Sequence, residues 1–138
     1  MSAVVSKALY ERLAGDSTLA ALLSTYNGRP AIFTPDLAPE DAQLPYISAP
    51  GEGTQRPWDT KTTQGFQVMR DISCYADPSG SAVVIETIAD RIRALLHRQP
   101  MAVEGYSVEV ADVTGPTMNP EDDAYGRQLT LRMLMKEV

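Results

Sequence analysis

The sequence has little of what enzymes, secreted mini-proteins and membrane proteins are commonly built from. Its 138 residues include one cysteine, Cys74, and one histidine, His97. A lone cysteine forms no disulfide within the chain and supplies no metal cluster, which favours synthesis in a reducing cytoplasm over secretion. No apolar run approaches the roughly 18 residues of a membrane-spanning helix, and the first residues do not follow the pattern of a signal peptide. We expect a soluble protein with no membrane partner, no metal and no cofactor.

Basic residues are also in the minority. Twelve Lys and Arg stand against eighteen Asp and Glu, which gives a formal net charge of −6. A protein that holds nucleic acid by neutralising its phosphates needs the opposite sign, so tight nucleic-acid binding is disfavoured. The same charge would suit a wall past which DNA slides without adhering, because like charges repel. The sign of the charge does not choose between these alternatives.

The composition is typical of one globular domain. Hydrophobic residues make up 43%, charged residues 22% and aromatic residues 7% of the chain, which argues against disorder and against a coiled coil. A chain of this length buries about two-thirds of the surface that its unfolded form exposes, so a core forms without bridges or metals. We expect a single domain over residues 1–138.

Two helices are indicated near the start of the chain. Over residues 2–14 the apolar residues recur on one helical face, and Gly15 is placed to end that helix. A second, short helical segment follows, for which Asp16 or Ser17 can serve as the N-cap.

The strongest helical pattern runs from about residue 81 to residue 98. Asp77 or Ser79 can cap it, because both side chains offer an acceptor oxygen just ahead of its first turn. Its apolar stripe is wide enough to cover a sheet. The stripe consists of Val84, Ile85, Ile88, Ala89, Ile92, Leu95 and Leu96.

A long half-buried strand is indicated by the period-two alternation of residues 64–75. Cys74 falls on its inner side together with one charged exception, Arg70. Met69 and Tyr75 fall on its outer side. Shorter extended pieces are expected at residues 31–33 and 46–48, and residues 49–62 read as a long functional or unstructured connection.

Two further strands alternate near the end of the chain and should pair as a hairpin. The first covers residues 106–111, with Tyr106, Val108 and Val110 on one side, and the second covers residues 128–136. Their connection is long and contains Gly115, Pro116, Asn119 and Pro120. The whole predicts an α+β fold, a largely antiparallel sheet of about four strands with the N-terminal helix and the long helix packed on one face.

No combination of residues indicates catalysis. A nucleophile–base pair would need Cys74 beside His97 with a third, orienting group, and burial of the cysteine as a small hydrophobic residue is the better interpretation. His97 lies in the last turn of the long helix, where a cation interacts favourably with the helix dipole. The acidic run of residues 121–123 fits no calcium-loop spacing and is better explained as a solvated turn.

The candidate interface begins with the connection around Trp58, because Trp and Arg are the residues most often found as interface anchors. Trp58 either covers one edge of the core or contacts a neighbouring subunit, and the sequence leaves both open. Apolar residues on the outer strand face and the acidic run complete the set. The candidate interface residues are Arg56, Trp58, Asp59, Lys61, Met69, Tyr75, Glu121, Asp122 and Asp123.

Five segments, in order, carry a family resemblance. They are ALYERLAGDSTLAALL (8–23), APEDAQLPYISAP (38–50), WDTKTTQGFQVMRDISCYA (58–76), AVVIETIADRIRALLH (82–97) and RQLTLRMLMKE (127–137). Together they resemble the tail terminators, which are small tail-completion proteins of long-tailed phages and gene transfer agents. The resemblance implies an α+β subunit that assembles as a six-membered ring on the finished tail tube, stops its polymerisation and offers a surface to the head connector. It implies no catalytic residues.

We therefore expect a structural virion protein rather than an enzyme. Its partners would be copies of itself, the major tail tube protein and the head–tail connector or head completion protein, with DNA passing through the pore without specific binding. It would be made in the host cytoplasm and lie at the head-proximal end of the tail. The alternatives are another neck or head–tail joining protein, a small cytosolic binding module, or a hydrolase that uses Cys74.

Overall fold

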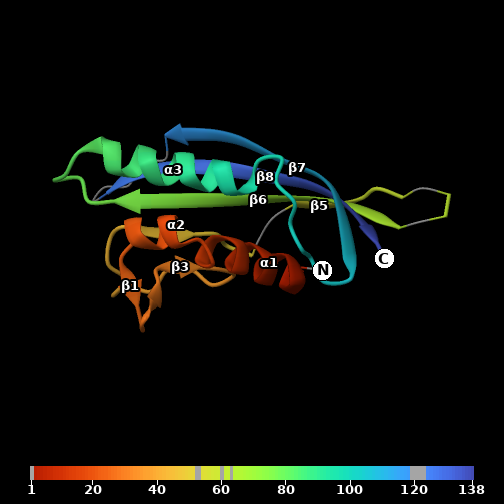
Figure 1. Ribbon diagram of the computed structural model, residues 1–138, viewed down its shortest axis with the longest axis horizontal. Helices are drawn as coiled ribbons and strands as arrows, with labels where there is room; N and C mark the ends of the chain where they lie inside the picture. Colours follow the sequence, from red (N-terminus) through yellow and green to blue (C-terminus); the bar gives the residue numbers. More distant parts are fainter. Residues whose placement is uncertain (1, 52–53, 60, 63, 119–123) are drawn as a thin grey trace.

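The centre of the molecule is a twisted six-stranded sheet (Figure 1). The computed structural model describes residues 2–51, 54–59, 61–62, 64–118 and 124–138. Strands follow one another across the sheet in the order β3-β4-β6-β8-β7, and β5 also pairs with β6. The bounds of the strands are β3 Ile32–Phe33, β4 Tyr46–Ser48, β5 Thr54–Pro57, β6 Gly65–Ala76, β7 Tyr106–Met118 and β8 Tyr125–Glu137.

The sheet is largely antiparallel, as the sequence predicts, but the expected number of about four strands is wrong. All neighbouring strands run antiparallel except β3 and β4, which run parallel. β3, two residues long, lies within the extended piece expected at residues 31–33 but also joins the sheet, whereas β5, four residues long, was not expected as a strand. Elements this short show no periodicity, so their pairing is decided by the tertiary structure. A separate small hairpin joins β1 (Thr25–Tyr26) to β2 (Arg29–Pro30).

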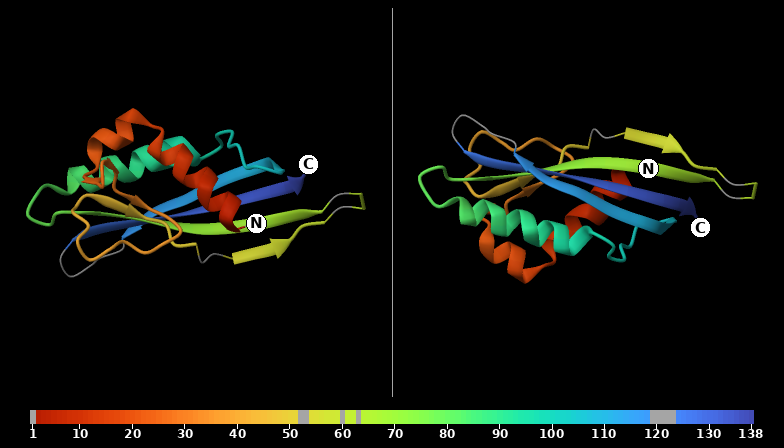
Figure 2. Two further views of the ribbon diagram at one scale, coloured as in Figure 1. Left: turned by 90° about the horizontal axis from the view of Figure 1, so that it is seen from below. Right: turned by 90° about the horizontal axis from the view of Figure 1, so that it is seen from above.

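The helices are α1 (Ser2–Ala14), α2 (Ser17–Leu22) and α3 (Ala82–Leu96). Figure 2 shows all three on the same side of the sheet, so that the opposite face carries no helix among the described residues. Helix α3 contacts β6, β7 and β8, and α1 contacts α2, α3 and β3. Among the helices that the structure describes, none is long and apolar enough to cross a membrane.

The helix ends follow from side-chain capping. Asp16 is the N-cap of α2 and accepts a 2.8 Å hydrogen bond from the Leu19 amide, as the sequence indicates. The N-cap of α3 is Ser81, whose Oγ accepts from the Val83 amide at 3.2 Å. The expectation that Asp77 or Ser79 caps this helix is wrong, because the Asp77 carboxylate is already used inside the preceding turn, where it accepts from Ser79.

The core between α3 and the sheet matches the expected stripe at every position but one. Val84 is 41% exposed, because it lies at the margin of the helix face that meets the sheet. Cys74 is fully buried on the inner face of β6, and Arg70 is buried there as well, donating from Nη1 to Ser6 Oγ of α1 at 3.0 Å. The buried stripe residues are Ile85, Ile88, Ala89, Ile92, Leu95 and Leu96.

The closing hairpin of β7 and β8 is confirmed, but β7 is longer and less regular than expected. Register shifts between Val108 and Val110, and between Thr114 and Thr117, insert bulges into it. The first bulge reverses the alternation, so Ala111 is buried inside rather than Val110. Gly115 and Pro116 lie within β7 and not in the connection, while Asn119 and Pro120 fall outside the described residues.

Part of the connection expected over residues 49–62 is a strand, since residues 54–57 form β5. β5 pairs with the first part of β6, from Thr54 opposite Met69 to Pro57 opposite Phe66. Figure 1 shows this hairpin projecting beyond the rest of the molecule at one end of its long axis. We call the described residues 54–59, 61–62 and 64–69 the hairpin arm.

Candidate assembly surfaces

The hairpin arm is held by contacts around Gly65. The Trp58 amide donates to the Gly65 carbonyl at 2.7 Å, and the Gly65 amide donates to Asp59 Oδ1 at 3.2 Å. The Trp58 ring lies against the Gly65 backbone, and Lys136 Nζ of β8 lies 5.5 Å from the ring centroid. Trp58 is half-buried by these contacts and does not belong to the hydrophobic core cluster. Its ring packs on the arm itself.

The structure brings the first four candidate interface residues together on the arm. Arg56, Asp59 and Lys61 are exposed, and each lies within three residues of Trp58 along the chain. A half-buried indole surrounded by exposed charges is the composition of an interface anchor with a polar rim. The arm therefore remains a candidate contact surface.

Met69 and Tyr75 are half-buried on β6, opposite Arg132 and Gly126 of β8. They lie six positions apart along the strand, which corresponds to about 20 Å, so the two do not form one patch. Met69 adjoins the arm, whereas Tyr75 belongs to an aromatic cluster at the other end of the strand. The remaining candidates, Glu121, Asp122 and Asp123, lie outside the described residues.

A row of four aromatic rings runs from β6 to the small hairpin. Tyr75 lies 5.3 Å from Tyr46, Tyr46 lies 5.9 Å from Phe33, and Phe33 lies 5.4 Å from Tyr26, all measured between ring centroids. The last two contacts along this row are edge-to-face, a favourable arrangement for aromatic pairs. Sequence reasoning missed the row, because its members are scattered along the chain and meet only through the register of β3, β4 and β6.

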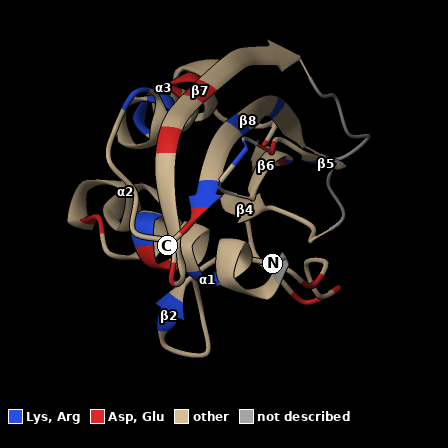
Figure 3. Ribbon diagram, turned by 90° about the vertical axis from the view of Figure 1, so that its right-hand side faces the viewer, with Lys and Arg blue, Asp and Glu red and all other residues tan. Residues whose placement is uncertain are grey.

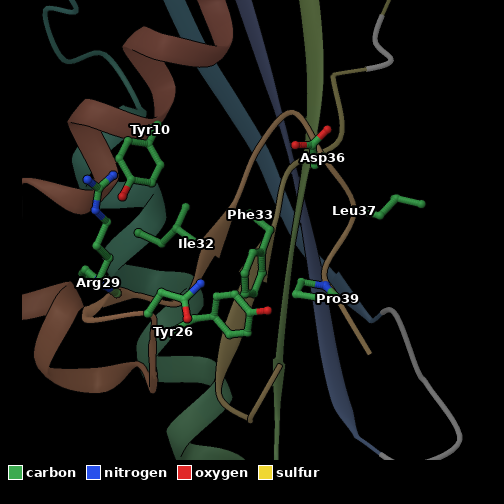
Figure 4. Close-up of a pocket in the computed structure, with 10 residues that line it drawn as sticks. Tyr10, Tyr26, Arg29, Ile32, Phe33, Asp36, Leu37 and Pro39 are labelled. Carbon is green, nitrogen blue, oxygen red and sulfur yellow. The ribbon is translucent and has the colours of Figure 1, made fainter. Parts of the chain in front are cut away.

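Beside this row lies a cleft of about 590 Å³, which we call the aromatic cleft. Figure 4 shows Tyr10 of α1 facing Phe33 and Ile32 across it, while Leu37 points outward. Leu37 is 74% exposed. The Tyr26 hydroxyl donates to Asp41 Oδ1 at 3.0 Å, and this carboxylate raises the pKa of Tyr26.

The two candidate reactive side chains, Cys74 and His97, both take part in hydrogen bonds to the backbone. Cys74 is fully buried, its thiol donates to the Arg127 carbonyl at 3.6 Å, and burial raises its pKa to about 12. His97 is the C-cap residue of α3, in keeping with the capping role that its position in the sequence indicates. Its Nδ1 accepts a 3.0 Å hydrogen bond from the Val113 amide. Within the described parts of the chain, no three His, Cys, Asp or Glu side chains gather as a metal site.

Three residues at the end of α3 and just after it close part of the outer edge of β7. His97 Nδ1 accepts from the Val113 amide, the Arg98 amide donates to the Ala111 carbonyl at 2.8 Å, and Arg93 Nη1 donates to the Val113 carbonyl at 2.8 Å. An open edge strand is a template for pairing with another chain, and these bonds occupy its backbone groups. Strand addition at the middle of β7 is blocked.

The described residues form a projecting arm, a sheet face without helices and an aromatic cleft, and the thiol and the imidazole take part in hydrogen bonds to the backbone. These features fit a structural protein that acts by association. Comparison with known proteins agrees with that class. The family model for tail completion protein gp17 matches residues 7–136, so the chain belongs to this family of virion tail components. The resemblance found in the sequence is thereby confirmed.

The fold is also found in a solved assembly. A chain in the structure titled "Virion of native gene transfer agent (GTA) particle" superposes with a TM-score of 0.77 at 21% sequence identity. The match covers 96% of this chain and 94% of that chain. The search of curated proteins gave no match.

Proposed function

We propose that this protein caps the head-proximal end of the tail tube as a six-membered ring, stops tube polymerisation and presents a surface to the head connector. The observation that carries the proposal is membership of the tail completion family over residues 7–136. The fold that it shares with a chain of a gene transfer agent particle supports the same role. The chain acts as one domain and transforms no substrate.

Ring formation is supported by the placement of the two candidate contact surfaces. The hairpin arm and the aromatic cleft are different surfaces, so contact between them is head to tail. Head-to-tail contacts close into a ring when the rotation between subunits closes. The net charge of −6 suits a pore through which DNA passes without adhering.

The test is a tube polymerisation assay. Purified tube protein is allowed to extend from preformed tubes with and without this protein, and tube lengths are measured by electron microscopy. We expect extension to stop in its presence, with a ring of extra density at the capped ends. Tubes that lengthen equally in both reactions and carry no added density would contradict the proposed function.

A second assay separates capping from other positions in the neck. Particles made without this protein should contain overlong tubes that do not join heads. Tubes of normal length that merely fail to join heads would instead make it a head–tail joining protein beyond the cap.

A further inference from the structure

We propose that the hairpin arm of one subunit docks into the aromatic cleft of the next copy of this chain. The inference rests on the proposed ring and names the two surfaces that form it.

The arm and the cleft lie apart on the molecule. Figure 1 shows the arm at one end of the long axis, whereas the β1–β2 hairpin beside the cleft lies toward the other end. The cleft is lined by residues of α1, β1, β2, β3 and the loop that follows β3. An arm cannot reach the cleft of its own subunit, but it can reach that of a neighbour. Such a contact uses two different surfaces and can therefore repeat around a ring.

The arm carries positive charge on an acidic chain. It presents Arg56 and Lys61, and Lys136 of β8 lies beside Trp58. Figure 3 looks onto this end of the molecule and shows basic positions on β8. The one acidic side chain among the arm residues 54–59 and 61–62, Asp59, accepts a hydrogen bond from the Gly65 amide.

Acidic residues outnumber basic residues at the rim of the cleft. Asp36, Glu40 and Asp41 are exposed along the loop after β3, and Arg29 is the basic residue among the cleft-lining side chains. Complementary charge of this kind orients the encounter of two surfaces and sets their register.

Both surfaces also offer apolar side chains. The arm offers exposed Pro57 and half-buried Trp58, and the cleft offers half-buried Tyr26 and Phe33 with exposed Leu37 at its mouth. The cleft volume of about 590 Å³ lies within the range of about 300–1,000 Å³ that is typical of ligand pockets. Trp and Tyr, like Arg, are enriched among the residues that anchor protein interfaces.

The alternative of sheet-to-sheet pairing through β7 is disfavoured. The backbone groups at Ala111 and Val113 are occupied by Arg98, His97 and Arg93. Association through the arm leaves these bonds intact.

The experiment is site-directed disulfide cross-linking on capped tubes. Subunits carrying both Lys61→Cys and Leu37→Cys are added to tail tubes, oxidised and separated without reductant. Both positions are exposed, and the native Cys74 is buried and does not compete. We expect a ladder of covalent oligomers larger than a dimer that collapses on reduction. The matched control pairs Lys61→Cys with Val83→Cys, which is 64% exposed on α3, and should stay monomeric.

The possible results distinguish a failure of the arm-to-cleft contact from a failure of the proposed ring. A ring seen by microscopy without the ladder would overturn this inference while leaving the proposed function intact. Covalent dimers without larger oligomers would mean that two subunits exchange arms reciprocally, and this result would also overturn the arm-to-cleft contact. A cross-link between the thiol at position 61 and the tube protein would overturn it as well. Absence of any ring at the tube ends would instead contradict the proposed function.

Charge reversal provides an independent measurement. Arg56→Glu with Lys61→Glu should reduce capping, and so should Asp36→Lys with Glu40→Lys. A single chain that carries all four changes should recover capping, because each interface then pairs reversed charges. Capping that stays lost in a folded chain with all four changes would contradict arm-to-cleft contact.

Discussion

Replacing Gly65 by alanine tests the packing that holds the hairpin arm. A Cβ added at Gly65 would overlap the Trp58 carbonyl oxygen, and it would lie 3.0 Å from the Met135 carbonyl oxygen and 3.1 Å from Trp58 Cε3. Because the overlapped oxygen belongs to the backbone, the two strands must separate to make room for the Cβ. We expect Gly65→Ala to move the arm by more than about 1 Å, since carbon atoms in contact lie roughly 3.5 Å apart.

The loss of stability caused by Gly65→Ala follows from the hydrogen bonds that this movement breaks. The Trp58 amide bond to the Gly65 carbonyl and the Gly65 amide bond to Asp59 are both lost or lengthened. At about 1 kcal/mol each, they amount to roughly 2 kcal/mol. If all of this appeared in global unfolding, Tm would fall by no more than about 8 °C for a domain of this size. Because the arm projects from the body, most of the cost should appear as local opening.

The assay uses the single tryptophan of the chain, which lies on the arm. Gly65→Ala should shift the Trp58 fluorescence to the red and speed hydrogen exchange at its amide, with little change in the exchange of α3. The control is Gly80→Ala, where the added Cβ would lie 3.7 Å from the Asp77 carbonyl oxygen, which is ordinary contact. Unchanged fluorescence and unchanged exchange in Gly65→Ala would refute the packing described for the arm.

Three further predictions concern the body of the molecule. Ile88→Asp should unfold the subunit, because it buries an unpaired charge between α3 and the sheet. The control, Val83→Asp on the exposed side of α3, should melt within a few degrees of wild type. If circular dichroism showed a folded Ile88→Asp protein, the helix face would be assigned wrongly. The hydrogen bonds from Arg91 are the main reason that the pKa of Asp16 is lowered to about 2. The ionised Asp16 should therefore add about 1–2 kcal/mol to the free energy of unfolding, fully present above pH 4 and lost as the pH falls toward 2. Asp16→Asn should remove this dependence and flatten the acid limb of a pH–stability curve. Cys74 should resist alkylation until the protein is unfolded by denaturant, and rapid labelling of the native protein would contradict its burial.

The elements that the sequence predicts well are those with long apolar periodicity. The buried stripe of α3 and the alternation of β6 are set by side chains spaced along one element, so local pattern is sufficient. The hairpin of β7 and β8 follows from the same alternation, but the bulge near Val110 is invisible in it, because an extra residue changes which side chains face inward without changing composition.

The parts that the sequence does not predict are those fixed by contacts between distant segments. β5 is short, contains Pro57 and lies at an edge, where a missing amide is tolerated, so its identity as a strand depends on pairing with β6. The arm residues around Trp58 could be grouped in advance, because they are contiguous. The residues of the aromatic cleft could not be grouped in advance, because α1, β1, β2, β3 and the loop after β3 all supply its walls.

The central claim is that this chain works by meeting copies of itself around a pore at the tail end. The most direct test is a cryo-electron microscopy reconstruction of the head-proximal end of assembled tails at a resolution that traces its backbone. The account predicts six copies in a closed ring on the last tube layer, each with its arm on the neighbouring subunit. A single copy at that position, or a chain that touches the tube with no sister subunit beside it, would contradict the account.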